Sequence, residues 1–408
     1  RVKDPLEEAG VDVTTRGARA TLLAVLLGIV VLVVAKPSAR YTMATIFGIV
    51  AMVVLHEAGH YLVAKRAGMK VTEFFVGFGP RLWSFRRGET EYGVKAILLG
   101  GYVRIVGMSN LEEVDPADEP RTFRRGSYGN RLKLTLAGVT VNVLIAFLLF
   151  FIVIAGQGRI AVGPNTTVNQ VETKTAAAAA GFHTGDRIVA VDGQPVRSWT
   201  ALSHAIQSRA GVAATFTVVR AHQTIDLRAA PARQGGKGFL GVAAGTQYEP
   251  VGLLDAVPQS FRAMGDITSG TGSALARLVS PAGVAKYSKN FTSPAPAAGS
   301  AAAQDRPMSL IGIVDQGSSV VNGHPWALLW LLGGISLILA LFNLLPVLPF
   351  DGGHAVVVLY EWIASKITHH EVRVDYRKLM PVSAVVLVLL LTLSLSAAFL
   401  DVRQAFGG

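Results

Sequence analysis

TMATIFGIVAMVVLHEAGHYLVAKR, residues 42–66, decides the fold, because an apolar run long enough to cross a membrane carries two histidines and a glutamate in its second half. At about 1.5 Å of rise per residue, a helix of this length spans a hydrocarbon core of about 30 Å. His56 and His60 are four residues apart and therefore lie on one helical face. Ionisable groups are costly inside a bilayer, so their presence here predicts a functional site.

The H-E-x-x-H spacing predicts a metal site. Two imidazoles on successive turns can bind one Zn²⁺, and Glu57 is placed to take a proton from a water molecule activated there. A catalytic zinc usually has three protein ligands and one open position, so another part of the chain must supply the third ligand. The alternative is chance occurrence, and the cost of placing three polar groups at metal spacing in an apolar helix argues against it.

The composition independently indicates an integral membrane protein. Hydrophobic residues make up 51% of the 408 residues, charged residues make up 16%, and the mean hydropathy is +0.43, all outside the usual range of soluble proteins. The net charge of +11 is explained by basic cytoplasmic loops, because the basic residues form no single patch, and no nucleic-acid partner is predicted. The chain has no cysteine, which excludes disulfides and thiolate ligands.

Hydropathy predicts five membrane spans, at residues 20–35, 42–64, 134–155, 326–349 and 379–400. The positive-inside rule then places residues 68–133 and 352–378 in the cytoplasm, and the region between the third and fourth spans outside. The expected domains are an N-terminal arm (1–19), an extra membrane helix (20–35), the first part of a membrane core (42–155), an extracytoplasmic sheet domain (161–233), a linker and helical region (234–325) and the second part of the core (326–408).

The window AAAAGFHTGDRIVAVDG, residues 177–193, resembles the PDZ domain signature. It combines small residues, a turn at Gly185–Asp186 and an alternating strand that starts at Arg187. PDZ domains bind extended peptides by strand addition, so a peptide C-terminus is an expected partner of this unit. A small β-rich domain without a ligand is the alternative.

The fourth span runs into NLLPVLPFDGGH, residues 343–354, which predicts a broken helix. Pro346 and Pro349 remove backbone donors, and a membrane tolerates this only where protein or a cavity satisfies the freed carbonyls. The glycine at Gly352 lets the backbone approach closely. In the predicted topology Asp351 lies at a depth similar to that of the H-E-x-x-H motif, so it can be the third zinc ligand.

Two further stretches are expected near this site. EYGVKAILLGGYVRIVGM, residues 91–108, predicts a hairpin-like pair of strands around Gly100 and Gly101, whose open edge can pair with an extended substrate. Gly138 and Asn142 lie four residues apart in the third span, and we interpret them as positions of helix packing.

With these motifs the chain resembles the site-2 protease family of intramembrane zinc proteases, and the bacterial regulators of sigma-factor signalling are the nearest group. The resemblance covers about residues 46–401 and includes VGFGPRLW (76–83), LLGGYV (98–103) and RPMSLIGI (306–313). It implies an α-helical integral membrane protein with four core transmembrane helices, one extra N-terminal helix and an inserted extracytoplasmic PDZ-like α+β domain. The implied location is the bacterial cytoplasmic membrane, with the active site near the cytoplasmic side.

The resemblance also implies roles for single residues. One zinc ion per chain is expected on His56, His60 and Asp351, with Glu57 as catalytic base. The substrate backbone is expected at Asn343, Gly100 and Gly101, and the structural residues near the site are Gly138, Asn142, Pro346, Pro349 and Gly352. The implied partners are membrane lipid and a single-pass membrane protein, either an anti-sigma factor or a signal-peptide remnant, which is cleaved in or next to its transmembrane helix.

Two other classes of function stay open at this point. A transporter or channel explains the broken helix and uses Asp351 as an ion site, but it leaves the H-E-x-x-H spacing as coincidence, and no inverted repeat is visible. A non-catalytic membrane scaffold recruits partners through its PDZ-like unit. It predicts that substitution of Glu57 changes nothing measurable.

Overall fold

The computed structural model describes residues 37–406 except 110, 163–165, 174, 235, 245 and 293–323. The predicted span 20–35 and the RPMSLIGI stretch lie outside the described residues. The chain divides into two compact units, one of residues 1–153 with 257–408 and one of residues 154–256. Among the described residues, four helices are long and apolar enough to cross a membrane: Arg40–Arg66, Tyr128–Gln157, Pro325–Asn343 and Met380–Arg403. They correspond to the four other predicted spans, and the chain is a membrane protein.

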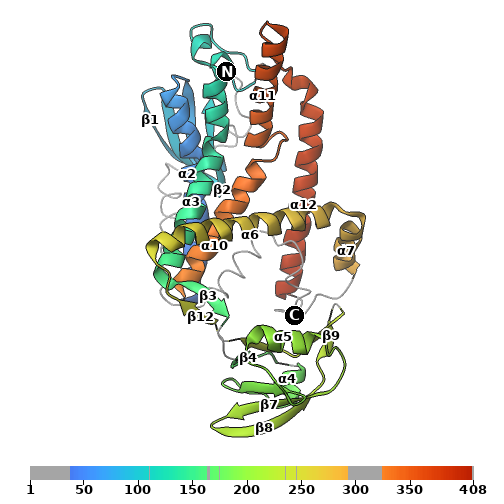
Figure 1. The fold of residues 1–408 in the computed structure, drawn as a ribbon. Coiled ribbons are helices and arrows are strands. Elements are labelled where there is room, and N and C mark those ends of the chain that lie inside the picture. The colour runs from blue at the N-terminus through green and yellow to red at the C-terminus, as the bar shows by residue number, and fades with distance from the viewer. Residues whose placement is uncertain are drawn as a thin grey trace. The chain divides into compact units, whose positions relative to one another are not determined.

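The helices of the first unit include the four candidate membrane spans, in α2, α3, α10 and α12 (Figure 1). Their bounds are α2 Pro37–Arg66, α3 Tyr128–Gln157, α6 Leu253–Val279, α7 Pro281–Thr292, α10 Pro325–Asn343, α11 Asp351–Thr368 and α12 Met380–Phe406. Helices α2 and α3 approach closely at Gly59, where an added Cβ atom would lie 2.9 Å from a methyl group of Val141. Small residues permit such close packing of membrane helices.

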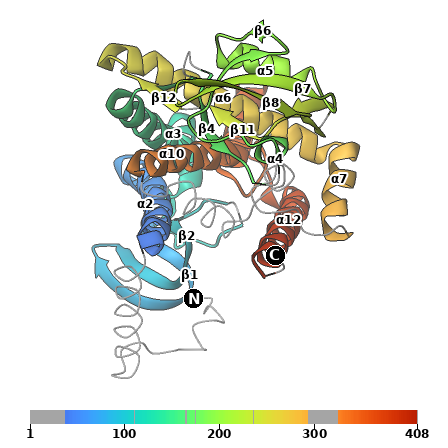
Figure 2. The same ribbon diagram turned by 90° about the horizontal axis from the view of Figure 1, so that it is seen from below.

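Helices α6 and α7 lie within the region 234–325, which the sequence predicts to be a linker and helical region. Figure 1 shows α6 running across α3, and the rings of Phe261 and Phe147 meet there at 4.9 Å between centroids. Figure 2 shows α7 beside α12, where the hydroxyl groups of Tyr287 and Ser396 are 2.8 Å apart. Each contact joins a helix of the predicted linker and helical region to a membrane helix, α6 to α3 and α7 to α12.

The segment 352–378, expected in the cytoplasm between two spans, is partly helical because α11 continues to Thr368. One face of α11 is buried through Val357, Val358 and Glu361, while the opposite face exposes apolar side chains. His369 then takes a left-handed conformation with φ of 57°, which ends the helix.

The predicted hairpin around Gly100 and Gly101 is wrong in its pairing. The strands are β1 Val71–Arg87 and β2 Thr90–Ile105, and the register pairs Val76 with both Gly101 and Val94. The first half of β1 therefore lies between the two parts of β2 that were expected to pair with each other. Both parts of β2 pair with β1, which lies earlier in the chain, and no local pattern in residues 91–108 predicts that pairing. The segment 101–105 is left at the edge of the sheet.

The second unit is built on the strand and turn predicted from the PDZ-like window. Strand β5 covers Arg187–Val191, and Gly185 before it has a φ of +95°, which favours glycine. A four-stranded sheet has the order β6-β5-β7-β8. The other strands and the two helices are β3 Arg159–Val162, β4 Val168–Val171, α4 Ala176–Ala179, β6 Gln194–Pro195, α5 Trp199–Gln207, β7 Ala214–Arg220, β8 Gln223–Ala229, β9 Ala232–Gln234, β10 Lys237–Phe239, β11 Val242–Ala244 and β12 Thr246–Glu249.

This unit extends further along the chain than the expected 161–233. Strand β11 pairs with β4, and β12 pairs with β3, so residues up to 249 return to its first strands. Leu240 accordingly belongs to the buried core of the unit, together with Phe182, Leu202 and Phe216. A domain boundary predicted from composition cannot detect pairing between strands that lie so far apart in the sequence.

We expect Asp186→Asn to destabilise the second unit by about 2–3 kcal/mol, because it leaves Arg220 without its charged partner. The Asp186 carboxylate is fully buried, accepts two hydrogen bonds from Arg220 at 2.7 and 2.8 Å, and accepts the His183 N–H at 2.8 Å. Hydrogen exchange in β5 and β7 of the intact chain measures the change, and Asp226→Asn on exposed β8 is the matched control. Equal exchange in both variants would contradict this role.

The same carboxylate makes the second unit sensitive to acid. Burial alone raises the pKa of Asp186, but the Arg220 guanidinium and the His183 N–H outweigh it and lower the pKa below the usual 3.8. A carboxylate whose pKa is lower in the folded state stabilises the fold fully at pH values above its unfolded-state pKa. This stabilisation is lost as the pH falls through the folded-state pKa. Hydrogen exchange in Asp186→Asn should therefore be faster than in the parent at neutral pH, and this difference should become smaller below about pH 4.

Candidate metal centre

Helix α2 presents His56 and His60 on one face, as their spacing predicts, and Asp351 joins them from the first residue of α11. The Nε2 atoms of the two histidines are 3.2 Å apart. The Oδ2 atom of Asp351 lies 3.2 Å from Nε2 of His56 and 3.3 Å from Nε2 of His60. Three groups able to bind a metal thus converge although they come from distant parts of the chain.

The size of this triangle fits zinc. Three ligands at about 2.0–2.1 Å from one ion in tetrahedral geometry lie about 3.3 Å from one another. The Oδ2 atom of Asp351 is buried and has no hydrogen-bond partner among the residues that the structure describes, as expected for an atom reserved for a cation. Both histidines are 8% exposed, so the donor set is shielded from solvent. Two imidazoles and one carboxylate are also a ligand set of catalytic zinc sites.

Gly138 lies against this triangle of ligand atoms, whereas the sequence indicated only a role in helix packing for it. A Cβ atom added to Gly138 would lie 2.4 Å from Cε1 of His56 and 2.4 Å from Nε2 of His60. Real Cβ atoms essentially never come so close to another heavy atom. The missing side chain of Gly138 therefore provides the space in which the three ligand atoms meet.

The backbone of α3 also orients one ligand. Nδ1 of His60 lies 2.8 Å from the carbonyl oxygen of Leu134, an acceptor, so this nitrogen carries the proton and Nε2 is left for a metal. A backbone contact of this kind leaves no residue-type signal, and the sequence therefore did not reveal Leu134.

Asp351 is positioned by the broken helix that the prolines predict. Helix α10 ends at Asn343, and residues 344–350, which contain Pro346 and Pro349, form a non-helical connection to α11. A Cβ atom on Gly352 would lie 2.3 Å from the carbonyl oxygen of Leu344, so only glycine permits this turn. The prediction of a close backbone approach at this glycine is confirmed.

Glu57 lies beside the edge of the β1–β2 sheet. A Cβ atom on Gly101 would be 3.3 Å from Cγ of Glu57 and 3.5 Å from a methyl group of Val53, so this edge of β2 touches the helix that carries the two histidines. Gly100 precedes it with a φ of +149° and packs on Phe78. The glutamate itself is half-buried.

The two asparagines singled out in the sequence differ in their surroundings. Asn142 is 2% exposed, and its backbone carbonyl oxygen accepts a hydrogen bond of 2.9 Å from the hydroxyl group of Ser336 on α10. This contact supports the packing interpretation of Asn142. Asn343 is half-buried at the end of α10, at the start of the connection that leads to Asp351.

Comparison with known proteins agrees with this geometry. The model of peptidase family M50 matches residues 44–390. The zinc metalloprotease Rip1 of Mycobacterium tuberculosis is 35% identical over 365 residues, which cover 80% of this chain and 88% of that protein. Rip1 of Mycolicibacterium smegmatis is 32% identical with the same coverage, and the metalloprotease MmpA of Caulobacter vibrioides is 30% identical over 74% of this chain and 82% of its own length. The chain belongs to peptidase family M50, the site-2 protease family, and is a zinc-dependent membrane metalloprotease.

Proposed function

We propose that the protein is an intramembrane endopeptidase that holds one zinc ion on His56, His60 and Asp351 and uses Glu57 as its general base. The observation that carries this proposal is the triangle of ligand atoms, with sides of 3.2–3.3 Å, formed by residues nearly three hundred positions apart. Family membership favours this function over the transporter and the scaffold.

The chemistry divides between the ion and the chain. A bound zinc ion supplies Lewis acidity that activates water and polarises the scissile carbonyl group. Glu57 then accepts a proton from the attacking water and delivers it to the leaving nitrogen. Leu134 keeps Nδ1 of His60 protonated, and the buried position of the ligands limits access of bulk water.

We propose that the edge of β2 receives the substrate as an added strand. A transmembrane helix must unwind before its backbone can be cleaved, and the unwound segment needs new hydrogen-bond partners inside the membrane. Segment 101–105 is at the sheet edge, and Gly101 brings it within contact of Glu57. Strand addition here would hold the scissile bond next to the base. Asn343 is the proposed additional partner of the substrate backbone.

We further propose that the second unit is a PDZ-like domain outside the cytoplasm. Its sheet, the short helix α4 and helix α5 support this proposal, as does the turn before β5. It would exclude substrates with bulky external domains or bind a C-terminus exposed by an earlier cut. The substrate class proposed from the family resemblance is a membrane-anchored anti-sigma factor or a signal-peptide remnant, cleaved near the cytoplasmic side.

Zinc content tests the ligand assignment without a known substrate. We expect one zinc ion per chain in the detergent-purified protein, and its loss or a severe weakening in both His56→Ala and Asp351→Ala, because two remaining ligands rarely hold a catalytic zinc ion. His204→Ala, on the exposed face of α5, and Asp226→Ala, on β8, are the matched controls and should keep the ion. Zinc retained at the parent level by either ligand variant would contradict the assignment.

A further inference from the structure

A fully buried ion pair lies away from the proposed zinc ligands, at the start of α3. Nη1 of Arg131 is 2.7 Å from Oε2 of Glu361 on α11, and both side chains are only 2% exposed. The Arg131 guanidinium also stacks over the ring of Phe123, at 4.9 Å from its centroid. Burial of two charges is expensive, and well-packed apolar residues in their place are often as stable or more stable. Such a pair therefore invites an explanation other than stability.

Glu361 is held from several sides. Its Oε1 accepts the Val374 N–H at 2.8 Å, and its Oε2 lies 3.3 Å from the second guanidinium, that of Arg373. One turn further along α11, the hydroxyl group of Ser365 is 2.9 Å from that of Tyr128, the first residue of α3. The contacts to Val374 and Arg373 tie Glu361 to the segment that follows α11. The ion pair with Arg131 and the contact between Tyr128 and Ser365 join α11 to α3, and both form in one position of α11 relative to α3.

The same stretch of α3 fixes the other half of the metal centre. Leu134, one turn after Arg131, provides the carbonyl oxygen that binds His60. Glu361 lies ten residues after Asp351 on α11, a rise of about 15 Å along one continuous helix. The start of α3 is thus bonded to a histidine ligand on α2 and to the helix whose first residue is the carboxylate ligand.

Apolar packing joins the same elements but specifies their register less strictly. Ala64 of α2, Leu134 of α3 and Val358 of α11 share one buried cluster with residues of the β1–β2 sheet. Apolar contacts are non-directional, so by themselves they specify the position of a helix less strictly than a charge pair does. A buried ion pair with its charged atoms 2.7 Å apart cannot follow a movement of the helix without leaving a charge unpaired.

We propose that Arg131 and Glu361 are positioning residues of the metal centre, which set α11 so that Asp351 meets the two histidines. This proposal rests on the ligand set proposed above. Displacement of α11 by a fraction of the 3.2–3.3 Å spacing would separate the carboxylate from the imidazoles and weaken zinc binding.

The test compares zinc affinity with stability in Arg131→Met, Glu361→Gln and the double variant of the full-length protein. Competition with a chromophoric chelator gives the affinity, and thermal unfolding of the metal-free protein gives the stability. We expect each single variant to bind zinc at least tenfold more weakly and to unfold at lower temperature. Glu361→Gln leaves the buried Arg131 without its charged partner, and Arg131→Met leaves Glu361 with only the longer contact to Arg373, at 3.3 Å.

The double variant separates positioning from simple stabilisation. It leaves no unpaired charge between the two sites, and the amide that Glu361→Gln introduces keeps an acceptor for the Val374 N–H, so its unfolding temperature should recover towards that of the parent. Its zinc affinity should stay low, because the ion pair that joins α3 to α11 is gone. Recovery of both quantities together, or parent affinity in the single variants, would overturn the proposal.

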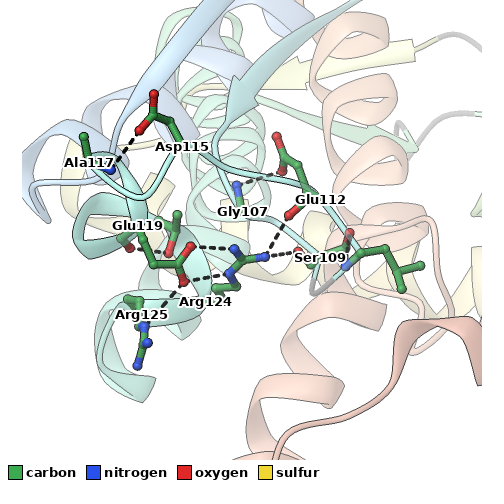
Figure 3. A network of polar contacts seen from close by, with 10 residues as sticks. Gly107, Ser109, Glu112, Asp115, Ala117, Glu119, Arg124 and Arg125 are labelled. Atoms are coloured by element: carbon green, nitrogen blue, oxygen red, sulfur yellow. Dashed lines mark hydrogen bonds and ion pairs between the residues drawn. The ribbon is translucent and has the colours of Figure 1, made fainter. Parts of the chain in front are cut away.

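Arg124→Met is the matched control for the arginine substitution. Arg124 lines the same cavity of about 260 Å³ as Arg131, Glu361 and Arg373. Its guanidinium, however, is bound within its own loop (Figure 3), by Glu119 at 2.9 Å and by the carbonyl oxygen of Glu112 at 2.9 Å. This variant should keep the zinc affinity of the parent.

Two further outcomes are distinguishable. If Arg131→Met does not fold, Arg131→Lys keeps the charge but loses the planar fork, and it should weaken zinc binding while the protein still folds; parent affinity in that variant and in Glu361→Gln would contradict the proposal. Absence of zinc from the parent, or its retention in His56→Ala, would instead contradict the ligand set itself.

Discussion

Replacement of Glu57 by glutamine is expected to abolish peptide-bond cleavage while one zinc ion stays bound per chain. The substitution keeps the size of the side chain but removes its ability to accept a proton, and a positioned general base contributes about 10²–10⁴-fold to the rate. Glu57 is not one of the three clustered residues that could bind the metal, so its replacement should change the zinc affinity little. We expect cleavage to fall by about a thousandfold, which is the middle of that range on a logarithmic scale.

The measurement pairs cleavage of a single-pass test protein, reconstituted with the enzyme in lipid vesicles, with zinc content of the same preparation. Glu113→Gln alters an exposed carboxylate in the loop before α3 and serves as the control for loss of one negative charge. Cleavage by Glu57→Gln at more than a tenth of the parent rate would exclude Glu57 as the base. Loss of zinc together with activity would assign it a role in metal binding instead.

The sequence was sufficient for those parts of the site that depend on local spacing. His56 and His60 share a face because a helix repeats every 3.6 residues, and an apolar run fixes that helix across the membrane. Asp351 became a candidate through topology, since charge bias in the loops placed it at a matching depth. The structure brings its carboxylate to both imidazoles, and the proline-containing connection before it is non-helical as predicted.

The parts that the sequence did not reveal are non-local contacts. Segment 101–105 pairs with the first half of β1, and nothing in residues 91–108 specifies a partner so much earlier in the chain. The bond from Leu134 to His60 uses a backbone oxygen, which every residue has. Arg131 and Glu361 are ordinary charged residues in predicted cytoplasmic segments, and only the packing of α3 on α11 makes them a buried pair.

Gly138 illustrates the same limit and leads to the second large effect. Its spacing from Asn142 indicates helix packing, and α3 does pack on α2, but the sequence does not show which side chains of α2 it faces. The structure places the two imidazoles there, with 2.4 Å between each ring and the position of an added Cβ atom. The glycine is therefore required by the metal centre more than by the helix contact.

Gly138→Ala is accordingly expected to reduce zinc affinity by at least a hundredfold. The new methyl group must push the imidazoles aside or separate α3 from α2, and His60 cannot move without losing its bond to Leu134. Gly129→Ala is the matched control, because Gly129 lies in the same helix and an added Cβ atom there meets nothing within 4 Å. In an open helical position this exchange stabilises by up to about 1 kcal/mol.

Chelator competition on both purified variants measures the effect, and thermal unfolding of the metal-free proteins shows whether the helices still pack. Because both substitutions replace glycine by alanine within α3, a difference in zinc affinity between the two variants reports the space at residue 138. If Gly138→Ala bound zinc as tightly as Gly129→Ala, the imidazoles would have to reach the ion from another direction, and the triangle of His56, His60 and Asp351 could not be the metal centre. A selective loss of zinc by a folded protein would instead show that the absence of one side chain on α3 is as necessary to the site as the presence of its three ligands.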